Sequence, residues 1–128
     1  MIGTLGTFAL ECPDPAALAE FYRQVTGWEV VYAHPDWYSL AERPDAPFFL
    51  SFQRSVDYQP PSWPDPRSSM QFHLHIKVDD LDDAQARVCA LGATLFDEQP
   101  DPRTVRVLAD PAGHPFCLCP QRTPAASD

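Results

Sequence analysis

The stretch FHLHIKVDD, residues 72–80, alternates apolar and polar side chains before it reaches two aspartates. A period of two is typical of a strand with one face on a core and the other face polar. The apolar positions of this stretch are therefore predicted to point toward a core. His73 and His75 share the opposite face, where they can be metal ligands, polar groups of a pocket, or ordinary surface residues.

The same pattern occurs once more, nearer the start of the chain. The stretch TFALECPD, residues 7–14, also alternates apolar and polar residues and also ends at an aspartate. Between the two copies lies the proline-rich stretch DYQPPSWPDPRSS, residues 57–69. Proline removes hydrogen-bond donors and fixes φ, so this stretch is predicted to be a connector between two similar halves.

An amphipathic helix is predicted after each of the two aspartates. Asp14 and Asp80 are suitable N-cap residues, since their carboxylates can accept hydrogen bonds from the first helical turn. Apolar residues then recur at helical spacing in both segments. Gly27 and Gly92 are placed to end these helices, because glycine tolerates the left-handed conformation of a C-terminal cap.

Short strand signals follow each helix, and each half closes with a similar run. APFFLSFQ aligns with HPFCLCPQ without a gap. The strands predicted after the helices are residues 28–33, 37–41, 46–53, 93–98, 104–110 and 114–121. Each half is therefore predicted to form a β-α-β-β-β module, which makes the fold class α+β. We expect the two modules to form a curved mixed sheet around a concave pocket, with the helices outside.

These patterns also set the expected domain organisation. One domain is expected over residues 1–122, because 128 residues suffice for a single hydrophobic core. Its parts are module one at 4–53, the connector at 54–69 and module two at 70–121. Residues 123–128 are expected to be a flexible tail.

Composition narrows the possible partners and the location. The formal net charge of −9 disfavours binding to nucleic acid. No apolar run approaches the roughly 20 residues needed to cross a bilayer, and no signal peptide is recognised. We therefore expect a cytoplasmic protein without a membrane or nucleic-acid partner. The four cysteines include no C-x-x-C pair and are expected to be reduced.

The tandem pattern resembles the vicinal oxygen chelate superfamily, which includes glyoxalases, bleomycin-resistance proteins and extradiol dioxygenases. The residues that carry this resemblance are CPDPAALAEFYRQVTGWEV, HLHIKVDDLDDAQARVCALGA and DPAGHPFCL. The connector stretch DYQPPSWPDP, residues 57–66, resembles the glyoxalase-like domain branch of this superfamily. The resemblance implies a small organic ligand in a central cavity and a homodimeric assembly.

The resemblance also implies four metal-ligand positions, one on each of four strands. In this sequence they are Thr7, Phe49, His73 and Cys117. Only His73 is a usual ligand, and a phenyl ring cannot coordinate a metal. We therefore expect no metal or other cofactor, although a divalent metal is possible if His73, His75 and Cys117 form an alternative site.

Aromatic residues supply the remaining evidence for a pocket. Trp37 and Phe49 are predicted to face a ligand, and Trp63 of the connector can fold over the pocket mouth. The alternative is that these side chains stabilise a dimer interface. Glu11 and His73 are candidate acid–base groups, although Glu11 can equally form a surface ion pair with Lys77.

The leading interpretation is a metal-free, small-molecule-binding protein whose ligand lies between aromatic rings and is oriented by His73 and His75. The first alternative is an enzyme, either a lyase or dioxygenase with an atypical metal site or a metal-independent isomerase. The second alternative is a structural dimer with a vestigial pocket. The sequence does not distinguish whether the modules pair within one chain or between two chains.

Overall fold

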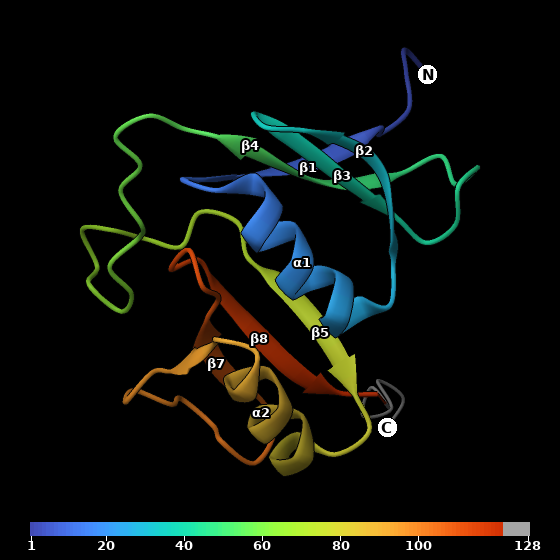
Figure 1. Ribbon diagram of the computed structural model, residues 1–128. Coiled ribbons are helices and arrows are strands. Elements are labelled where there is room, and N and C mark those ends of the chain that lie inside the picture. Colours follow the sequence, from blue (N-terminus) through green and yellow to red (C-terminus); the bar gives the residue numbers. More distant parts are fainter. Residues whose placement is uncertain (122–128) are drawn as a thin grey trace. The chain divides into compact units, whose positions relative to one another are not determined.

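A computed structural model describes residues 1–121 of the chain. The chain divides into two compact units, one comprising Met1–Gln59 and the other beginning at Pro60. Each unit contains one helix and one four-stranded mixed sheet (Figure 1). The predicted α+β fold with two tandem β-α-β-β-β modules is therefore confirmed. The predicted flexible tail at 123–128 lies outside the described residues.

The first unit forms its sheet in the order β1-β4-β3-β2. Strands β1 and β4 are parallel, and the other two pairs are antiparallel. The elements are β1 (Thr7–Cys12), α1 (Pro15–Thr26), β2 (Glu29–His34), β3 (Trp37–Ala41) and β4 (Phe49–Arg54). A register shift between Val30 and Tyr32 interrupts the pairing of β2 with β3.

Local capping fixes both ends of α1, as the sequence predicted. Asp14 Oδ1 accepts a hydrogen bond from the backbone N–H of Ala17 at 3.2 Å, and Pro15 takes the first helical position. Gly27 has φ +74° and donates its N–H to the Arg23 carbonyl at 2.9 Å. Within residues 1–121, neither this helix nor the other has the length and apolar character needed to cross a membrane.

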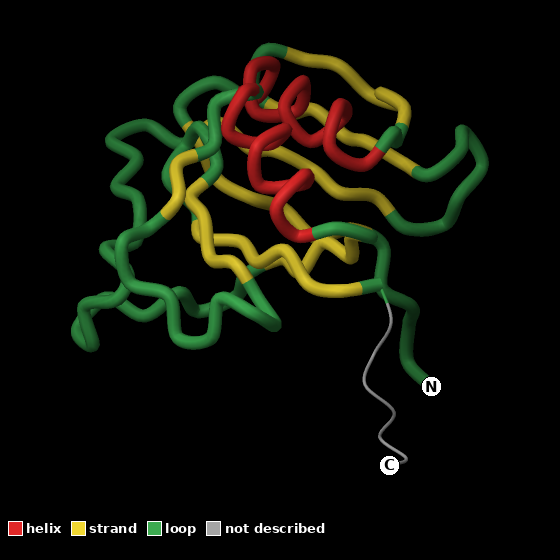
Figure 2. The backbone as a smooth tube through the Cα atoms, turned by 90° about the horizontal axis from the view of Figure 1, so that it is seen from below, coloured by secondary structure: helices red, strands yellow, loops and turns green. Residues whose placement is uncertain are grey.

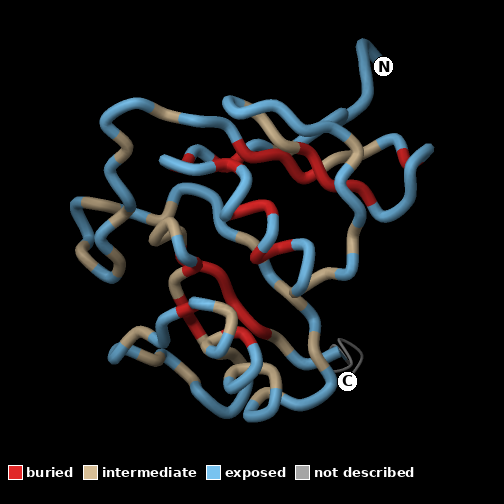
Figure 3. Tube along the Cα trace, viewed as in Figure 1, coloured by how far each residue is buried: buried red, intermediate tan, exposed pale blue. Residues whose placement is uncertain are grey.

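The core of the first unit lies between α1 and one face of its sheet. Tyr22 of α1 and Phe52 of β4 are both fully buried, and their rings stack with centroids 5.7 Å apart. Leu18 and Leu40 complete this apolar layer. Figure 3 shows the buried residues concentrated in the helix and the inner strands. Burial of these large side chains is the main stabilising contribution in this unit.

The second unit repeats the same arrangement with shorter elements. Its strand order is β5-β8-β7-β6, with β5 and β8 parallel. The elements are β5 (Leu74–Val78), α2 (Leu81–Ala90), β6 (Thr94–Leu95), β7 (Arg106–Ala109) and β8 (Pro115–Pro120). Asp80 caps α2 by accepting a hydrogen bond from Asp83 N at 2.9 Å, and Gly92 follows the helix with φ +117°.

One predicted strand is much shorter than expected. The stretch 93–98 contributes only Thr94 and Leu95 to the sheet. The side-chain amide of Gln99 replaces the missing strand, because it accepts from Val107 N at 3.0 Å and donates to Val107 O at 2.8 Å. A side chain thus satisfies the backbone groups that a longer β6 would have paired.

The segment between β4 and β5 contains neither helix nor strand (Figure 2). In the second unit, Trp63 of this segment contacts Phe96 edge-to-face, with ring centroids 5.0 Å apart. Pro60 lies so close to Gly113 that a Cβ at position 113 would stand 2.7 Å from the Pro60 Cβ. Gly113 also has φ +92°, so both its conformation and its surroundings require glycine.

Candidate functional site

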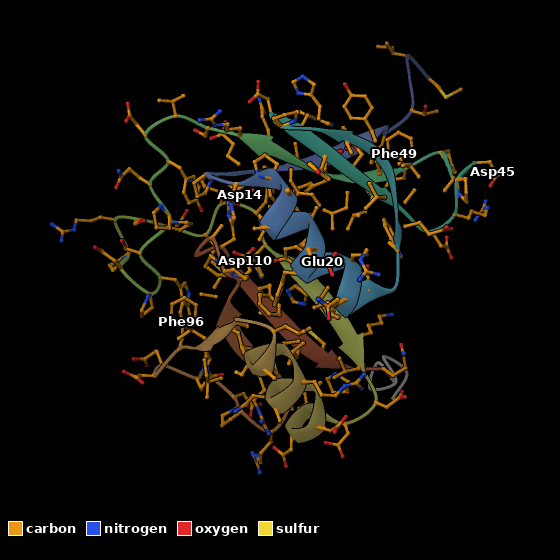
Figure 4. All side chains as sticks on the ribbon, in the orientation of Figure 1. Asp14, Glu20, Asp45, Phe49, Phe96 and Asp110 are labelled. Atoms are coloured by element: carbon orange, nitrogen blue, oxygen red, sulfur yellow. The ribbon has the colours of Figure 1, made fainter. Side chains whose placement is uncertain are left out.

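The sheet face of the first unit that is turned away from α1 carries aromatic and hydroxyl side chains. Alternation along β4 sends Phe52 to the core and Phe49 and Ser51 to this opposite face. Figure 4 labels Phe49 on this side of the sheet. A concavity of about 540 Å³ lies here, lined by Thr7, Val31, Tyr32, Trp37, Ser39, Pro44, Phe49 and Ser51. Its size and mixed lining suit a small organic molecule.

A continuous chain of hydrogen bonds links polar side chains that line this concavity. Trp37 Nε1 donates to Ser39 Oγ at 2.9 Å, and Ser39 Oγ lies 2.8 Å from Ser51 Oγ. Ser51 Oγ in turn lies 2.6 Å from Thr7 Oγ1, which donates to the Phe49 carbonyl at 3.1 Å. Ser39 and Ser51 are buried, so the chain gives these hydroxyls the partners that burial requires.

The second unit holds a compact group of histidines and cysteines on one face of its sheet. The pairing of β5 with β8 places His75 opposite Cys117. His75 Nε2 lies 2.9 Å from His73 Nε2, and His75 Nδ1 lies 3.1 Å from Cys119 Sγ. Ligand atoms of His73, His75 and Cys117 all fall within 4.8 Å of one another. These three groups could hold a metal ion.

Burial shifts the pKa of His73, Cys117 and Cys119 toward their uncharged forms. Burial, followed by the neighbouring His75, lowers the pKa of His73. Burial, followed by Cys119, raises the pKa of Cys117 to about 11. Burial also raises the pKa of Cys119, against a smaller opposing effect of Lys77. Near neutral pH this face therefore presents a neutral His73 imidazole and two protonated thiols.

The metal site implied by the superfamily does not fit the residues at its four positions. Phe49 has no ligand atom in its side chain, and Thr7 already uses its hydroxyl in contacts with Ser51 and Phe49. His73 and Cys117 then remain as two candidate ligands, and Cys117 must lose its proton before it binds a metal. Two ligands are fewer than the three that a catalytic zinc site provides.

Trp63 and Glu11 are neither among the residues that line the concavity nor among the three groups that could hold a metal. Trp63 contacts Phe96 in the second unit. Glu11 is an exposed residue of β1 whose register partner is Gln53. The structure thus brings Thr7, Trp37 and Phe49 together in one unit, and His73, His75 and Cys117 together in the other.

The sequence did not single out Ser39 and Ser51 as site residues, and it did not place Cys119 among the candidate ligands. The signal for the two serines was their position, because each lies two residues after an aromatic residue predicted to face the ligand, Trp37 or Phe49. A polar residue at that spacing in an otherwise apolar strand belongs to the same face. Cys119 shares the face of Cys117 for the same reason.

Comparison with known proteins identifies the class and then the family. The sequence profile of the family described as "Glyoxalase-like domain" matches residues 7–119. The chain has the fold of the vicinal oxygen chelate superfamily, as the resemblance implied. Within that superfamily it belongs to the glyoxalase-like domain family. No curated protein matches the sequence.

Solved structures with the same fold have low sequence identity. A glyoxalase/bleomycin resistance protein/dioxygenase family enzyme from Burkholderia phytofirmans PsJN aligns with TM-score 0.68 and 19% identity, over 94% of this chain and 100% of that chain. A mutant of the fosfomycin resistance protein FosX from Listeria monocytogenes, complexed with Mn(II) and 1S,2S-dihydroxypropylphosphonic acid, aligns with TM-score 0.69 and 17% identity, over 96% and 95%. The trypanothione-dependent glyoxalase I of Leishmania major aligns with TM-score 0.63 and 16% identity, over 93% and 87%.

Proposed function

We propose that this protein binds a small organic molecule in the concavity of its first unit and does so without the divalent metal usual in the superfamily. One observation supports this most. The superfamily positions Thr7 and Phe49 lie in a concavity of about 540 Å³, as a hydrogen-bonded hydroxyl and an aromatic ring instead of metal ligands. Trp37 and Tyr32 add further aromatic surface. A flat ligand can stack on these rings while polar groups orient it.

A thermal-shift screen of small aromatic compounds tests this proposal. A compound present at about ten times its Kd adds about 1.4 kcal/mol to the free energy of unfolding, which raises Tm by several degrees. We expect Trp37→Ala to abolish the shift, because it removes the largest ring of the concavity. The matched control is Trp63→Ala, which removes a tryptophan that packs on Phe96 in the other unit.

Two results would contradict the proposal. If no compound raises Tm, the protein is better described as a structural dimer with a vestigial pocket. If hits persist in Trp37→Ala and vanish in Trp63→Ala, the ligand binds elsewhere. Elemental analysis of the purified protein gives an independent check, since a stoichiometric divalent metal would overturn the metal-free part of the proposal.

The second candidate function is a metal-dependent lyase or dioxygenase with an atypical site. The proximity of His73, His75 and Cys117, within 4.8 Å, favours it specifically. Two imidazoles and one thiolate suit zinc better than the hard cations that prefer oxygen. The FosX neighbour was solved with Mn(II), which is such a harder ion. Stoichiometric zinc that is lost in both His75→Ala and Cys117→Ala would favour this candidate.

A further inference from the structure

Proton counting fixes the direction of the hydrogen-bond chain in the first unit. The chain contains four contacts, and its donors are the Trp37 indole and the hydroxyls of Ser39, Ser51 and Thr7. The indole N–H can only donate, and the Phe49 carbonyl can only accept. Each of the four contacts receives a proton in one arrangement alone, in which Ser39 donates to Ser51 and Ser51 donates to Thr7.

This direction leaves the hydroxyls without a free proton. Every O–H of the chain is already directed at the next oxygen, so each oxygen offers a ligand only its remaining lone pair. Ser51 is fully buried and Ser39 is 3% exposed, whereas Thr7 is an exposed residue at the end of the chain. The accessible polar group of the chain is therefore an acceptor, Thr7 Oγ1.

The lining also lacks charge. Among the described residues that line the concavity there is no Lys, Arg, His, Asp or Glu. A carboxylate or phosphonate bound there would lose its hydration without gaining a cationic partner or a donor from the hydroxyl chain. Tyr32 has the one lining hydroxyl outside the chain, and with a residue exposure of 53% it belongs to the rim.

We propose that the ligand of this concavity is an uncharged aromatic compound that carries an O–H or N–H donor and directs it at Thr7 Oγ1. This inference rests on the proposed function and narrows its ligand class. The ring would lie against Trp37 and Phe49, and the donor would occupy the free lone pair of Thr7. Anionic substrates are disfavoured by the same arrangement.

Three ring compounds of similar size test whether the concavity prefers a neutral donor over a neutral compound without a donor and over an anion. Phenol carries the donor, anisole has the same oxygen capped by a methyl group, and benzoate is anionic at pH 7. Each is titrated into the full chain while NMR follows the Trp37 indole N–H, assigned with Trp37→Phe. We expect phenol to bind about fivefold more tightly than anisole, the effect of one neutral hydrogen bond. Benzoate should bind most weakly.

Thr7→Val tests the acceptor itself. The substitution keeps the side-chain volume and removes the acceptor oxygen, so the preference for phenol over anisole should fall to about onefold. Thr94→Val, at an exposed position of β6 in the other unit, is the matched control and should leave both affinities unchanged. The indole and amide spectra report whether each variant is folded.

The outcomes distinguish this inference from the proposed function. If anisole or benzoate binds as tightly as phenol, or if Thr7→Val retains the phenol preference, the inference is wrong while the concavity remains a binding site. If none of the three compounds perturbs the Trp37 signal and the compound screen also yields no hit, both the inference and the proposed function fail.

Discussion

At pH 8, iodoacetamide should alkylate Cys117 about a hundredfold more slowly than a thiol with the ordinary pKa of 9.0, after dialysis against EDTA. The thiolate is the reactive form, and burial raises the pKa of Cys117 to about 11. The ionised fraction at pH 8 is then about one in a thousand instead of about one in ten. The low exposure of Cys117, 5%, slows the reaction further. Peptide mass spectrometry measures the rate.

The pH dependence of this reaction tests whether the raised pKa of Cys117 causes the slow alkylation. Because the thiolate fraction grows with pH below the pKa, the rate at Cys117 should rise about tenfold per pH unit up to about pH 10 and level off near pH 11. Cys89 is partly exposed in α2 and serves as the internal reference. Alkylation of Cys117 at pH 8 as fast as in the urea-unfolded chain would contradict the prediction. It would mean that this thiol is accessible and readily ionised.

This result bears on the choice between the two candidate functions. A metal at His73, His75 and Cys117 requires the Cys117 thiolate, so binding must expel a proton that the metal-free protein holds tightly. A slowly reacting thiol would show that the metal-free protein holds the proton that a bound metal would have to displace. A reactive thiolate would support the site that needs it.

Local signals in the sequence were sufficient to predict most of the fold. Asp14 and Gly27 define the ends of α1 through contacts within a few residues, and these contacts are visible in the sequence as cap types. The β6 prediction was wrong in length because the deciding contact joins Gln99 to Val107, eight residues away. Such a contact depends on how the chain turns between the two residues, which strand periodicity does not encode.

The sequence predicted which candidate-site residues share a face of the sheet, but it did not predict which of them form hydrogen bonds with one another. Alternation predicted that Trp37 and Phe49 share one environment, and both line the concavity. The hydroxyl chain depends on the register that sets Ser39 opposite Ser51 and Thr7 opposite Phe49. Register between strands that are distant in sequence arises only when the whole sheet assembles, so the bonds of Ser51 could not be read from β4 alone.

Replacing Phe52 by alanine is expected to lower the free energy of unfolding by about 3–5 kcal/mol. Phe52 is fully buried and stacks on Tyr22, so the substitution removes a ring and leaves a cavity between α1 and the sheet. Urea unfolding followed by far-UV circular dichroism measures the change. Val56→Ala, at a residue that is 80% exposed, is the control and should change stability by less than about 0.5 kcal/mol.

Phe49→Ala provides the matched comparison, because Phe49 and Phe52 lie on opposite faces of the same strand. Phe49 is half-buried in the concavity, so its loss should lower stability by only about 1 kcal/mol and should abolish the ligand-induced rise in Tm. Equal destabilisation by the two substitutions would contradict this division, since it would make Phe49 a core residue. Strand β4 would then not separate a stabilising face from a ligand-binding face, and the case for the concavity as the functional site would be lost.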